Sequence, residues 1–514
     1  MITRVTSAGV TGIAATPVDV EVDGAMWSGE SEPPFVIVGL PDKSVAESKE
    51  RVKSAISNSG YDVPALKITV NLAPADMKKQ GPSYDLPIAI GVLTVGHQVD
   101  PHAVSRHAMI GELALDGRIR AVSGVLPIII ELKKRQVTSI IVPTDNAGEA
   151  AVVEGVEIIP CDHLREVIAF INGNGPIEPF KADVDSYFSN AFDFEADFRD
   201  VKSQESAKRA LMIAAAGGHN LIMIGNPGVG KSMLSKRLPG ILPRMTLDEA
   251  LETTRVYSVA GLVTKSEPLI TRRPFRSPHH TISDAGMIGG GSSPRPGEIS
   301  LAHNGVLFLD ELPEFNRKTL EVMRQPLEDG TVTISRASGS AEYPARMMMI
   351  AAMNPCPCGY RGHATKPCRC SFRQVASYQS RISGPLLDRI DIHLTVPSVD
   401  VKTLSSQAEG MTTAEMRKQV QAARDVQTGR FEGARNGLHN NAGMNDREIG
   451  NYCELAPEVK ATLDQAMEAL QLSARAYTRI RKIARTIADL EASVDIQLHH
   501  ITEAVSYRTL DKPE

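Results

Sequence analysis

Aromatic side chains are scarce in this 514-residue chain: phenylalanine, tyrosine and tryptophan make up 4% of it, and Trp27 is its one tryptophan. Few aromatics leave little for stacking on nucleic-acid bases, so any such contact is expected to follow the phosphates through arginine and lysine. An excess of positive charge is lacking too, because the net charge is −5. A nucleic-acid surface would therefore be a local basic patch.

Long apolar runs are also missing. No stretch approaches the roughly 20 residues that a membrane-spanning helix needs, and the first residues do not begin the apolar core of a signal peptide. Cysteine is limited to six residues, and four of them lie within residues 356–370, which is not the pattern of a secreted disulfide framework. We therefore expect a cytoplasmic protein without membrane association.

What the sequence does contain is a phosphate-binding loop. Residues 225–232 read GNPGVGKS and fit the pattern G-x-x-x-x-G-K-[ST], between a predicted buried strand and a predicted helix. The backbone N–H groups of such a loop and the helix start attract phosphate. Lys231 is predicted to reach the β- and γ-phosphates, and Ser232 to hold Mg²⁺. The predicted nucleotide-binding residues are Gly225, Asn226, Pro227, Gly228, Val229, Gly230, Lys231 and Ser232.

A second motif supplies the carboxylates that hydrolysis requires. Residues 305–311 read GVLFLDE, a short buried strand that ends in two acidic residues. Asp310 is predicted to join the Mg²⁺ shell and to contribute to nucleotide binding, and Glu311 to be the base that polarises the attacking water. Asn354, at the end of another apolar run, is predicted to orient that water or the γ-phosphate. Capping of the turn before Pro355 is the alternative for Asn354.

Arginine-bearing segments between and after these motifs are candidates for DNA contact. Residues 257–296 form a poorly periodic insertion whose arginines include Arg276 and Arg295. Phosphate contact fits them, and the alternative is a structural hairpin between protomers, with arginines that pair with acidic neighbours. Further on, two strand-like runs bracket a small polar tip, which predicts a β-hairpin. Arg336 at this tip is a third DNA candidate, or else a solvated loop arginine.

Four cysteines form two C-x-C pairs with nine residues between them: Cys356, Cys358, Cys368 and Cys370. Paired thiolates across a short loop typically hold Zn²⁺ in a tetrahedron, with His363 as a fifth possible ligand. Free or redox-active thiols are the alternative. A closed four-ligand site would serve local folding, because it leaves no open catalytic position.

Three further arginines are candidates for contact with the γ-phosphate. Arg389 follows a predicted helix, and there an arginine could reach the nucleotide of a neighbouring protomer and neutralise charge in the transition state. Arg381 is the second candidate for this role, and an ion pair of Arg389 with Asp388 or Asp391 is the alternative. Arg475 begins a C-terminal helix and is predicted to join the nucleotide-binding residues.

Composition divides the chain into four parts. Residues 1–170 read as an α/β domain without a nucleotide motif, and residues 171–192 as a Gly-, Pro- and Asn-rich linker that lets its neighbours move independently. Residues 193–398 are predicted to be an ATPase core with a parallel sheet, and residues 399–514 an α-helical lid. The predicted fold class is multidomain α/β.

The N-terminal part resembles the proteolytic domain of Lon. The resemblance rests on a Gly-Pro-Ser turn before an apolar helix and on the later run Ile-Gly-Glu-Leu. In that family the serine of the turn is the nucleophile, and a later lysine is its base. Ser83 stands at the serine position, but Leu126 stands where the lysine belongs, and the next lysine is Lys133. We expect a Lon-like fold without peptidase activity, with Ser83 as a helix N-cap.

All these motifs together resemble the YifB/ComM family of magnesium-chelatase-like AAA+ ATPases, over essentially the whole chain. The resemblance implies a homo-hexamer that binds ATP and Mg²⁺ between protomers, with Arg389 acting across the interface. It also implies a branch-migration helicase that acts on single-stranded, duplex and branched DNA and promotes integration of single-stranded DNA by homologous recombination during natural transformation. A chelatase-type motor subunit and a protein-remodelling ATPase stay open as alternatives.

Overall fold

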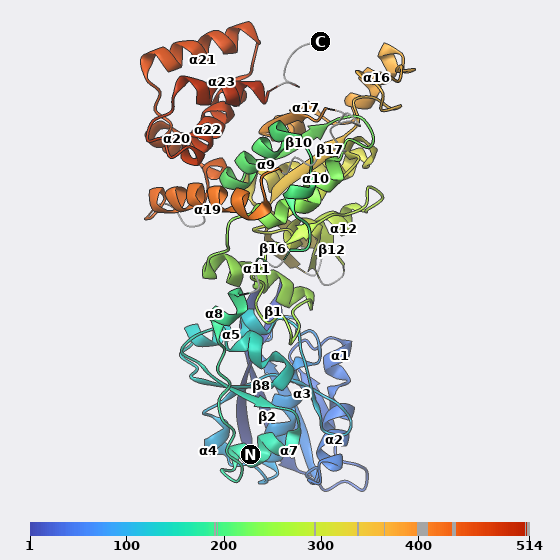
Figure 1. Cartoon of the computed structure of the whole chain (residues 1–514). Coiled ribbons are helices and arrows are strands. Elements are labelled where there is room, and N and C mark those ends of the chain that lie inside the picture. The colour runs from blue at the N-terminus through green and yellow to red at the C-terminus, as the bar shows by residue number, and fades with distance from the viewer. Residues whose placement is uncertain are drawn as a thin grey trace.

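A computed structural model describes residues 1–189, 192, 194–291, 294–336, 339–363, 365–397, 410–433, 438–508 and 510. The described chain is elongated, with the N-terminal domain at one end, the predicted ATPase core in the middle and a helical C-terminal region at the other end (Figure 1). Among the described residues, no helix is both long and apolar enough to cross a membrane.

The N-terminal domain is built on a seven-stranded mixed sheet in the order β3-β4-β2-β1-β5-β8-β9. The long strands β1 (Ile2–Thr11) and β2 (Ala14–Met26) form an antiparallel hairpin, and β2 also pairs antiparallel with β4 (Leu66–Ala73). The other strands add in parallel at both edges: β3 (Phe35–Val38), β5 (Ala108–Met109), β8 (Ser139–Pro143) and β9 (Glu157–Cys161). A separate small hairpin joins β6 (Glu112–Leu113) and β7 (Ile119–Arg120).

Helices cover this sheet, and the most deeply placed is α3 (Asp85–Val95). All eleven of its residues are buried, as expected for a helix that is apolar all round. The other helices of the domain are α1 (Lys43–Ala46), α2 (Ser48–Asn58), α4 (Pro101–Val104), α5 (Val125–Lys134), α6 (Ala147–Ala150) and α7 (Leu164–Ile171), and α8 (Val184–Phe188) follows in the linker.

The residues of the Lon-like turn lie differently from the prediction in one respect. Ser83 is inside a 3₁₀ turn, η1 (Pro82–Tyr84), and Tyr84 is the residue that precedes α3, so the prediction of Ser83 as a helix N-cap is wrong. Leu126 is completely buried, and its backbone N–H donates to Glu149 Oε1 at 2.9 Å. A leucine side chain accepts no proton, so this position supplies no base to a serine.

The ATPase core contains a five-stranded sheet in the order β11-β14-β17-β10-β18, and every pairing in it is parallel. Its strands are β10 (Leu221–Ile224), β11 (Phe275–Arg276), β14 (Val306–Leu309), β17 (Met348–Met353) and β18 (Ile392–Thr395). The continuous apolar runs of β10, β14 and β17 suit strands that are covered on both faces. Because the carboxyl ends of parallel strands share one edge, the residues that follow these three strands gather there.

Helices and short strands complete the core. The helices are α9 (Glu205–Gly217), α10 (Lys231–Arg237), α11 (Leu247–Ala260), α12 (Asp284–Ile288), α13 (Glu298–Leu301), α14 (Arg317–Val322), α15 (Arg324–Asp329), α16 (Phe372–Gln379) and α17 (Gly384–Leu387). The insertion forms a small hairpin of β12 (Gly289–Gly290) and β13 (Arg295–Pro296). The predicted later hairpin is confirmed as β15 (Thr331–Arg336) and β16 (Gly339–Pro344), and tip residues 337 and 338 lie outside the described residues.

The N-terminal domain and the core are packed together. The N-terminal hydrophobic core includes Met245, Ala250 and Leu269 from the ATPase side, since α11 packs on α5. At the β1–β2 turn, a Cβ on Gly12 would lie 2.9 Å from Ala341 of β16. These contacts hold the two domains together, so the linker is not the free joint that its composition predicts.

The C-terminal region is helical, as predicted, and lies beyond the core (Figure 1). Its helices are α19 (Thr413–Arg430), α20 (Asp446–Tyr452), α21 (Pro457–Ala469), α22 (Ala474–Leu490) and α23 (Leu498–Ser506). Helices α19 and α22 both pack on α9 of the core. The predicted boundary between residues 398 and 399 lies outside the described residues.

Candidate active site

The phosphate loop connects β10 to α10 as the sequence predicts. Gly228 and Gly230 adopt φ of +82° and +93°, a region that favours glycine. Lys231 begins α10, and its Nζ donates to the backbone oxygens of Gly225 at 2.6 Å and Asn226 at 3.1 Å. Burial lowers the pKa of Lys231, although the nearby carboxylates of the second motif oppose that shift. The ammonium is thus held against the loop whose phosphate it is predicted to bind.

The two predicted Mg²⁺ ligands meet at the same edge of the sheet. Ser232 Oγ donates to Asp310 Oδ2 at 2.6 Å, across the space between α10 and the end of β14. A hydroxyl and a carboxylate are the hard oxygen ligands that Mg²⁺ prefers, and Mg²⁺ typically completes its octahedron with water and substrate phosphate. The residues present therefore fit a nucleotide-bound magnesium ion.

Glu311 follows directly in a strained conformation. Its φ is +52°, which is uncommon for a residue with a side chain and often occurs at functional sites. The Glu311 side chain is 57% exposed, and its Oε2 lies 3.7 Å from Nδ1 of His280. An accessible carboxylate beside the predicted Mg²⁺ ligand Asp310 suits a base for water. His280 lies in the insertion of residues 257–296 and was not among the predicted site residues.

Asn354 reaches the site because β17 lies between β14 and β10 in the sheet. Its Oδ1 accepts a hydrogen bond from Lys231 Nζ at 3.1 Å. The Asn354 backbone is hydrogen-bonded to the phenol of Tyr378 on α16, and burial raises the pKa of that phenol to about 12. The asparagine is therefore fixed from both sides, beside the lysine that is predicted to bind the γ-phosphate.

Gln204 is a site residue that sequence reasoning missed. It precedes α9 with φ of +63°, and its buried Nε2 donates to the Val229 carbonyl of the phosphate loop at 2.7 Å. No periodicity or motif marks this glutamine, because its role depends on a contact between segments that are distant in sequence.

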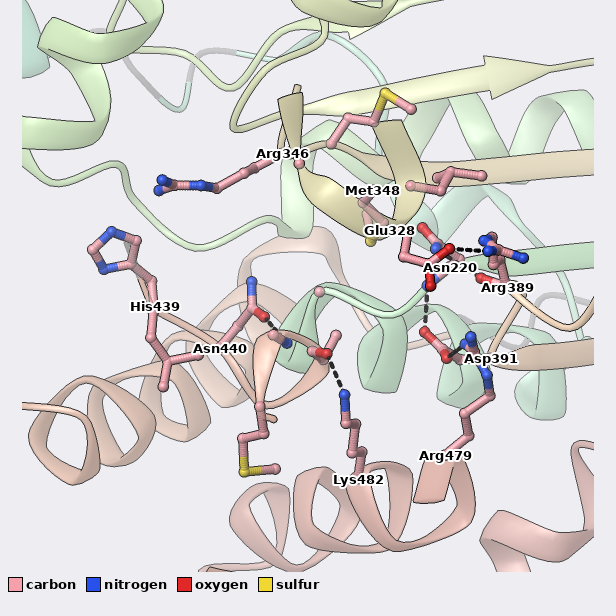
Figure 2. Close-up of a pocket in the computed structure, with 18 of the residues that line it drawn as sticks. Asn220, Glu328, Arg346, Met348, Arg389, Asp391, His439, Asn440, Arg479 and Lys482 are labelled. Carbon is pink, nitrogen blue, oxygen red and sulfur yellow. Dashed lines mark hydrogen bonds and ion pairs between the residues drawn. The ribbon is translucent and has the colours of Figure 1, made fainter. Parts of the chain in front are cut away.

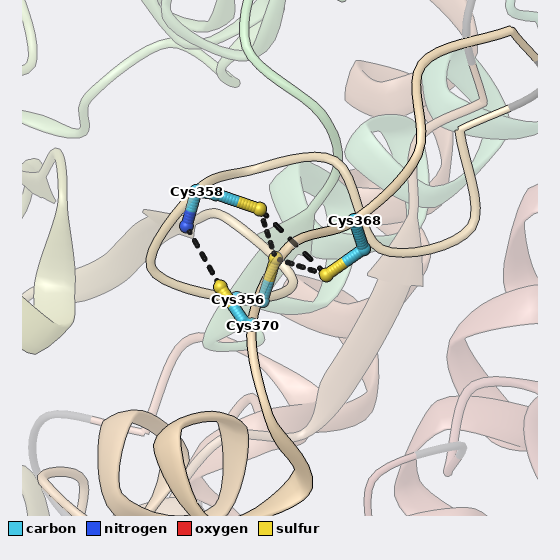
Figure 3. A group of neighbouring side chains, drawn as sticks. All are labelled: Cys356, Cys358, Cys368 and Cys370. Atoms are coloured by element: carbon cyan, nitrogen blue, oxygen red, sulfur yellow. Dashed lines mark hydrogen bonds between the residues drawn. The ribbon is translucent and has the colours of Figure 1, made fainter.

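The four predicted zinc ligands come together in one cluster (Figure 3). The Sγ atoms of Cys356, Cys358 and Cys368 lie 3.4–3.6 Å apart, and all four sulfurs lie within 4.8 Å of one another. Tetrahedral zinc with Zn–S bonds of about 2.3 Å needs S···S separations of roughly 3.8 Å, so the set fits Zn²⁺. Backbone N–H groups of residues 360 and 369 lower the pKa of Cys358 to about 6, which favours the thiolate.

His363 is not part of this cluster. Its Nδ1 accepts hydrogen bonds from the backbone N–H groups of Thr365 and Lys366, both at 3.1 Å. The ring therefore caps a turn within the loop, and the four cysteines alone make the candidate ligand set.

A second group of potential ligands, Glu491, His499 and His500, is already satisfied internally. His500 Nδ1 accepts the backbone N–H of Gln497 at 2.9 Å, so in the neutral ring Nε2 carries the proton and donates to Glu491 Oε2 at 3.1 Å. Arg209 donates to the other carboxylate oxygen at 2.7 Å. This arrangement ties α9 to the C-terminal helices and offers a metal no open histidine lone pair on His500.

Arg389, which was predicted to reach the nucleotide of a neighbouring protomer, lies at the amino ends of the strands, opposite the end that carries the phosphate loop. Its backbone oxygen accepts from the side chain of Asn220 at 2.9 Å, and Asn220 directly precedes β10, whereas the phosphate loop follows β10. The guanidinium pairs with Glu328, so the partners named in the ion-pair alternative, Asp388 and Asp391, are wrong (Figure 2). Arg389 and the phosphate loop of its own chain therefore lie at opposite ends of the sheet strands.

Arg389 borders a large cavity at that edge, with a volume of about 970 Å³. Asp391 pairs there with Arg479 of α22 (Figure 2), which ties the C-terminal region to the sheet. Arg475 lines the same cavity, and its Nη1 lies 3.1 Å from Asp388 Oδ2. The Arg475 side chain, which was predicted to contact the nucleotide, thus also lies away from the phosphate loop of its own chain.

Two of the other predicted arginines, Arg381 and Arg276, form ion pairs with acidic side chains of their own chain. Arg381 pairs with Glu314 at 2.9 Å. Arg276 forms a two-point contact with Glu298 at 2.6 and 2.7 Å, as the structural alternative for the insertion expects.

Two DNA candidates remain on the surface, on neighbouring hairpins. Arg295 of β13 and Arg336 of β15 are both exposed. Gly290 pairs with Arg295, and a Cβ on Gly290 would lie 3.3 Å from the guanidinium of Arg336. The fold therefore gathers these two arginines on one face.

Comparison with known families and proteins agrees with this arrangement. Three family models match the chain. The model described as magnesium chelatase, subunit ChlI, matches residues 197–404, and the model of subunit ChlI of Mg-chelatase matches residues 20–146. The model of the C-terminal part of ChlI matches residues 410–508. YifB of Salmonella typhimurium, an uncharacterized protein, is 44% identical over 504 residues, which cover 98% of this chain and 96% of YifB.

Two further relatives extend the comparison. The competence protein ComM of Haemophilus influenzae is 42% identical over 506 residues, 97% of this chain and 96% of ComM. Lon protease 2 of Bacillus subtilis shows a partial likeness, 29% identity over 146 residues, 28% of this chain and 26% of that protease. By its near full-length match to YifB and ComM, the chain belongs to the YifB/ComM family of magnesium-chelatase-like AAA+ proteins.

Proposed function

We propose that this protein is an ATP-driven DNA motor that acts as a homo-hexamer and catalyses branch migration. In this proposal it promotes integration of single-stranded DNA by homologous recombination during natural transformation. The observation that carries the ATPase part is the gathering of a lysine, two Mg²⁺-type ligands, an accessible carboxylate and an asparagine at one edge of the parallel sheet.

Each of these residues has a defined task in hydrolysis. Lys231 exchanges its bonds to backbone oxygens for the β- and γ-phosphate oxygens, where its charge is needed. Ser232 and Asp310 would hold a magnesium ion, which would neutralise charge on the phosphates. Glu311 accepts a hydrogen bond from the attacking water and polarises it, and Asn354 holds the water or the γ-phosphate in line.

The positions of the arginines support hydrolysis between protomers. Arg389 and Arg475 lie at the amino edge of the sheet, away from the phosphate loop of their own chain. If one protomer presents this edge to the phosphate loop of the next, both arginines approach the bound nucleotide from outside. Head-to-tail contacts of this kind generate a ring when the rotation between neighbours closes, as the proposed hexamer requires.

Two observations support the DNA part of the proposal: exposed arginines on neighbouring hairpins, and the similarity to ComM. Arg295 and Arg336 lie on adjacent hairpins and give a basic face to a protein whose net charge is negative. ComM of Haemophilus influenzae, which is similar over nearly its whole length, is a competence protein. We further propose that the four cysteines hold a structural Zn²⁺.

Movement of a synthetic four-way DNA junction in the presence of ATP tests this proposal. We expect the wild-type protein to move the branch point until the junction separates into duplexes, and Lys231→Ala to leave the junction intact. Replacing Arg295 and Arg336 together by alanine should abolish junction movement with little effect on ATP hydrolysis in the absence of DNA. The matched control is Arg118→Ala, which removes an exposed arginine of the N-terminal domain.

Two results would overturn the proposal in different ways. Full junction activity in the double arginine variant would remove these hairpins from the DNA path. ATP hydrolysis without movement of any DNA substrate would instead favour a chelatase-type motor subunit, to which the three matching family models point, or a protein-remodelling ATPase.

A further inference from the structure

The four-cysteine loop folds back onto the phosphate loop. Asn226, the second residue of GNPGVGKS, is almost fully buried, and its Nδ2 donates to the backbone oxygen of Gly359 at 2.6 Å. The same Nδ2 lies 3.4 Å from the backbone oxygen of Arg361. Gly359 directly follows Cys358, so the side chain of a nucleotide-site residue is clamped by backbone that a zinc ligand positions.

A second contact makes the approach closer than a side chain would allow. Gly359 has φ of +80°, and a Cβ placed there would lie 2.6 Å from both Cγ and Cδ of Pro227 in the phosphate loop. Glycine is thus required both for the backbone conformation and for the distance. The cysteine loop therefore bears directly on two consecutive residues of the phosphate loop.

Both ends of the cysteine loop are also tied to the site. Asn354, which contacts Lys231, is only two residues before Cys356. After the loop, Tyr378 of α16 is hydrogen-bonded to the Asn354 backbone. In the described part of this loop, from Pro355 to Cys370, the backbone forms neither helix nor strand, and the sulfur cluster joins its two ends.

We propose that the metal-bound cysteine loop is a positioning element of the nucleotide site, which sets the affinity for ATP through Asn226 and Pro227. With zinc bound, the backbone oxygens of residues 359 and 361 stay in place and hold the phosphate loop in its binding shape. Without zinc, these oxygens move and Asn226 loses its anchor. This inference rests on the proposed binding of ATP at the phosphate loop.

Two glycines of the same loop provide a matched test. Gly359 and Gly362 have similar φ values, +80° and +75°, but a Cβ on Gly362 would meet nothing within 4 Å. We expect both Gly359→Ala and Gly362→Ala to retain one zinc per chain by metal analysis. Binding of a fluorescent ATP analogue should weaken by about tenfold or more in Gly359→Ala, because the phosphate loop is displaced, and should stay near wild type in Gly362→Ala.

Equal nucleotide affinity in the two zinc-loaded variants would overturn the inference. Should Gly359→Ala lose its zinc or fold poorly, removal of zinc from the wild type and from Asn226→Ala decides. We expect chelation to weaken nucleotide binding by the wild type, and restored zinc to recover it, whereas Asn226→Ala binds weakly with or without zinc. A wild-type affinity that chelation leaves unchanged would reduce the cysteines to local folding.

The same measurements separate this inference from the proposal on which it rests. If zinc-loaded wild-type protein does not bind the ATP analogue at all, the proposed ATP site fails, while the zinc content is unaffected. If it binds the analogue with an affinity independent of zinc, the ATP site stands and the positioning role fails.

Discussion

Replacing Arg389 by alanine should stop ATP hydrolysis while leaving the protomer folded. The Arg389 guanidinium pairs with Glu328, whose side chain is 60% exposed, and Nη1 donates to the Pro385 carbonyl at 2.7 Å. An ion pair with one partner in solvent contributes about 1 kcal/mol or less to the free energy of unfolding. An arginine that neutralises transition-state charge contributes about 10³- to 10⁵-fold in kcat, or roughly 4–7 kcal/mol. The catalytic effect should therefore far exceed the effect on stability.

Two companion variants identify the reason for the loss. Glu328→Gln removes the ion pair but keeps the arginine, so ATP hydrolysis should persist if Arg389 is catalytic. Lys231→Ala should be inactive through the other side of the interface. In rings assembled from equal amounts of Lys231→Ala and Arg389→Ala, about one interface in four combines an intact phosphate loop with an intact arginine, so roughly a quarter of the activity should return.

The assay is phosphate release in the presence of DNA, with ring assembly followed by size-exclusion chromatography and light scattering. Each variant alone should assemble and stay inactive, and the mixture should regain hydrolysis. If mixed rings form without recovering activity, Arg389 does not act across the interface. Loss of activity in Glu328→Gln equal to that in Arg389→Ala would show that the ion pair itself is what matters.

Four further predictions follow from the site and its surroundings. Glu311→Gln should bind ATP and assemble, but release phosphate about 10²- to 10⁴-fold more slowly; unchanged turnover would remove it as the base. His280→Ala should lower kcat with little change in KM, because His280 contacts the Glu311 carboxylate; a change in KM alone would contradict this. Cys368→Ser should lower zinc content and thermal stability, and unchanged metal analysis would leave the cysteines as plain thiols. Burial lowers the pKa of His393 to about 3. Its imidazole therefore stays neutral in the folded protein, whereas in the unfolded chain it takes up a proton below pH ~6.5. The free energy of unfolding should then fall by about 2 kcal/mol between pH 7 and pH 5 from this group, and His393→Gln should remove that part of the slope in urea titrations.

The residues at the carboxyl edge of the core sheet were predictable because local patterns specify them. The apolar runs before Gly225, Asp310 and Asn354 indicated buried strands, and the structure confirms β10, β14 and β17 there. Parallel pairing then brings Ser232 to Asp310 and Asn354 to Lys231 without further information. The cysteine cluster was predictable for the same reason, since spacing along a short loop determines which sulfurs can meet.

Contacts between distant segments were not predictable. Glu328 as the partner of Arg389, and Gln204 against the phosphate loop, depend on packing that no periodicity encodes. The composition of the linker indicated a flexible joint, but it contains no information about α11, which packs the core against the N-terminal domain. The N-cap prediction for Ser83 failed because the chain inserts a 3₁₀ turn before α3.

The most direct test of the central claim is ATP hydrolysis by the purified protein alone and with single-stranded, duplex and branched DNA, each at two salt concentrations. The account predicts strong stimulation by DNA, greatest with branched substrates and weaker at the higher salt concentration, because phosphate contacts are lost as counterions compete. A rate of hydrolysis that is the same with and without every DNA would contradict the DNA motor.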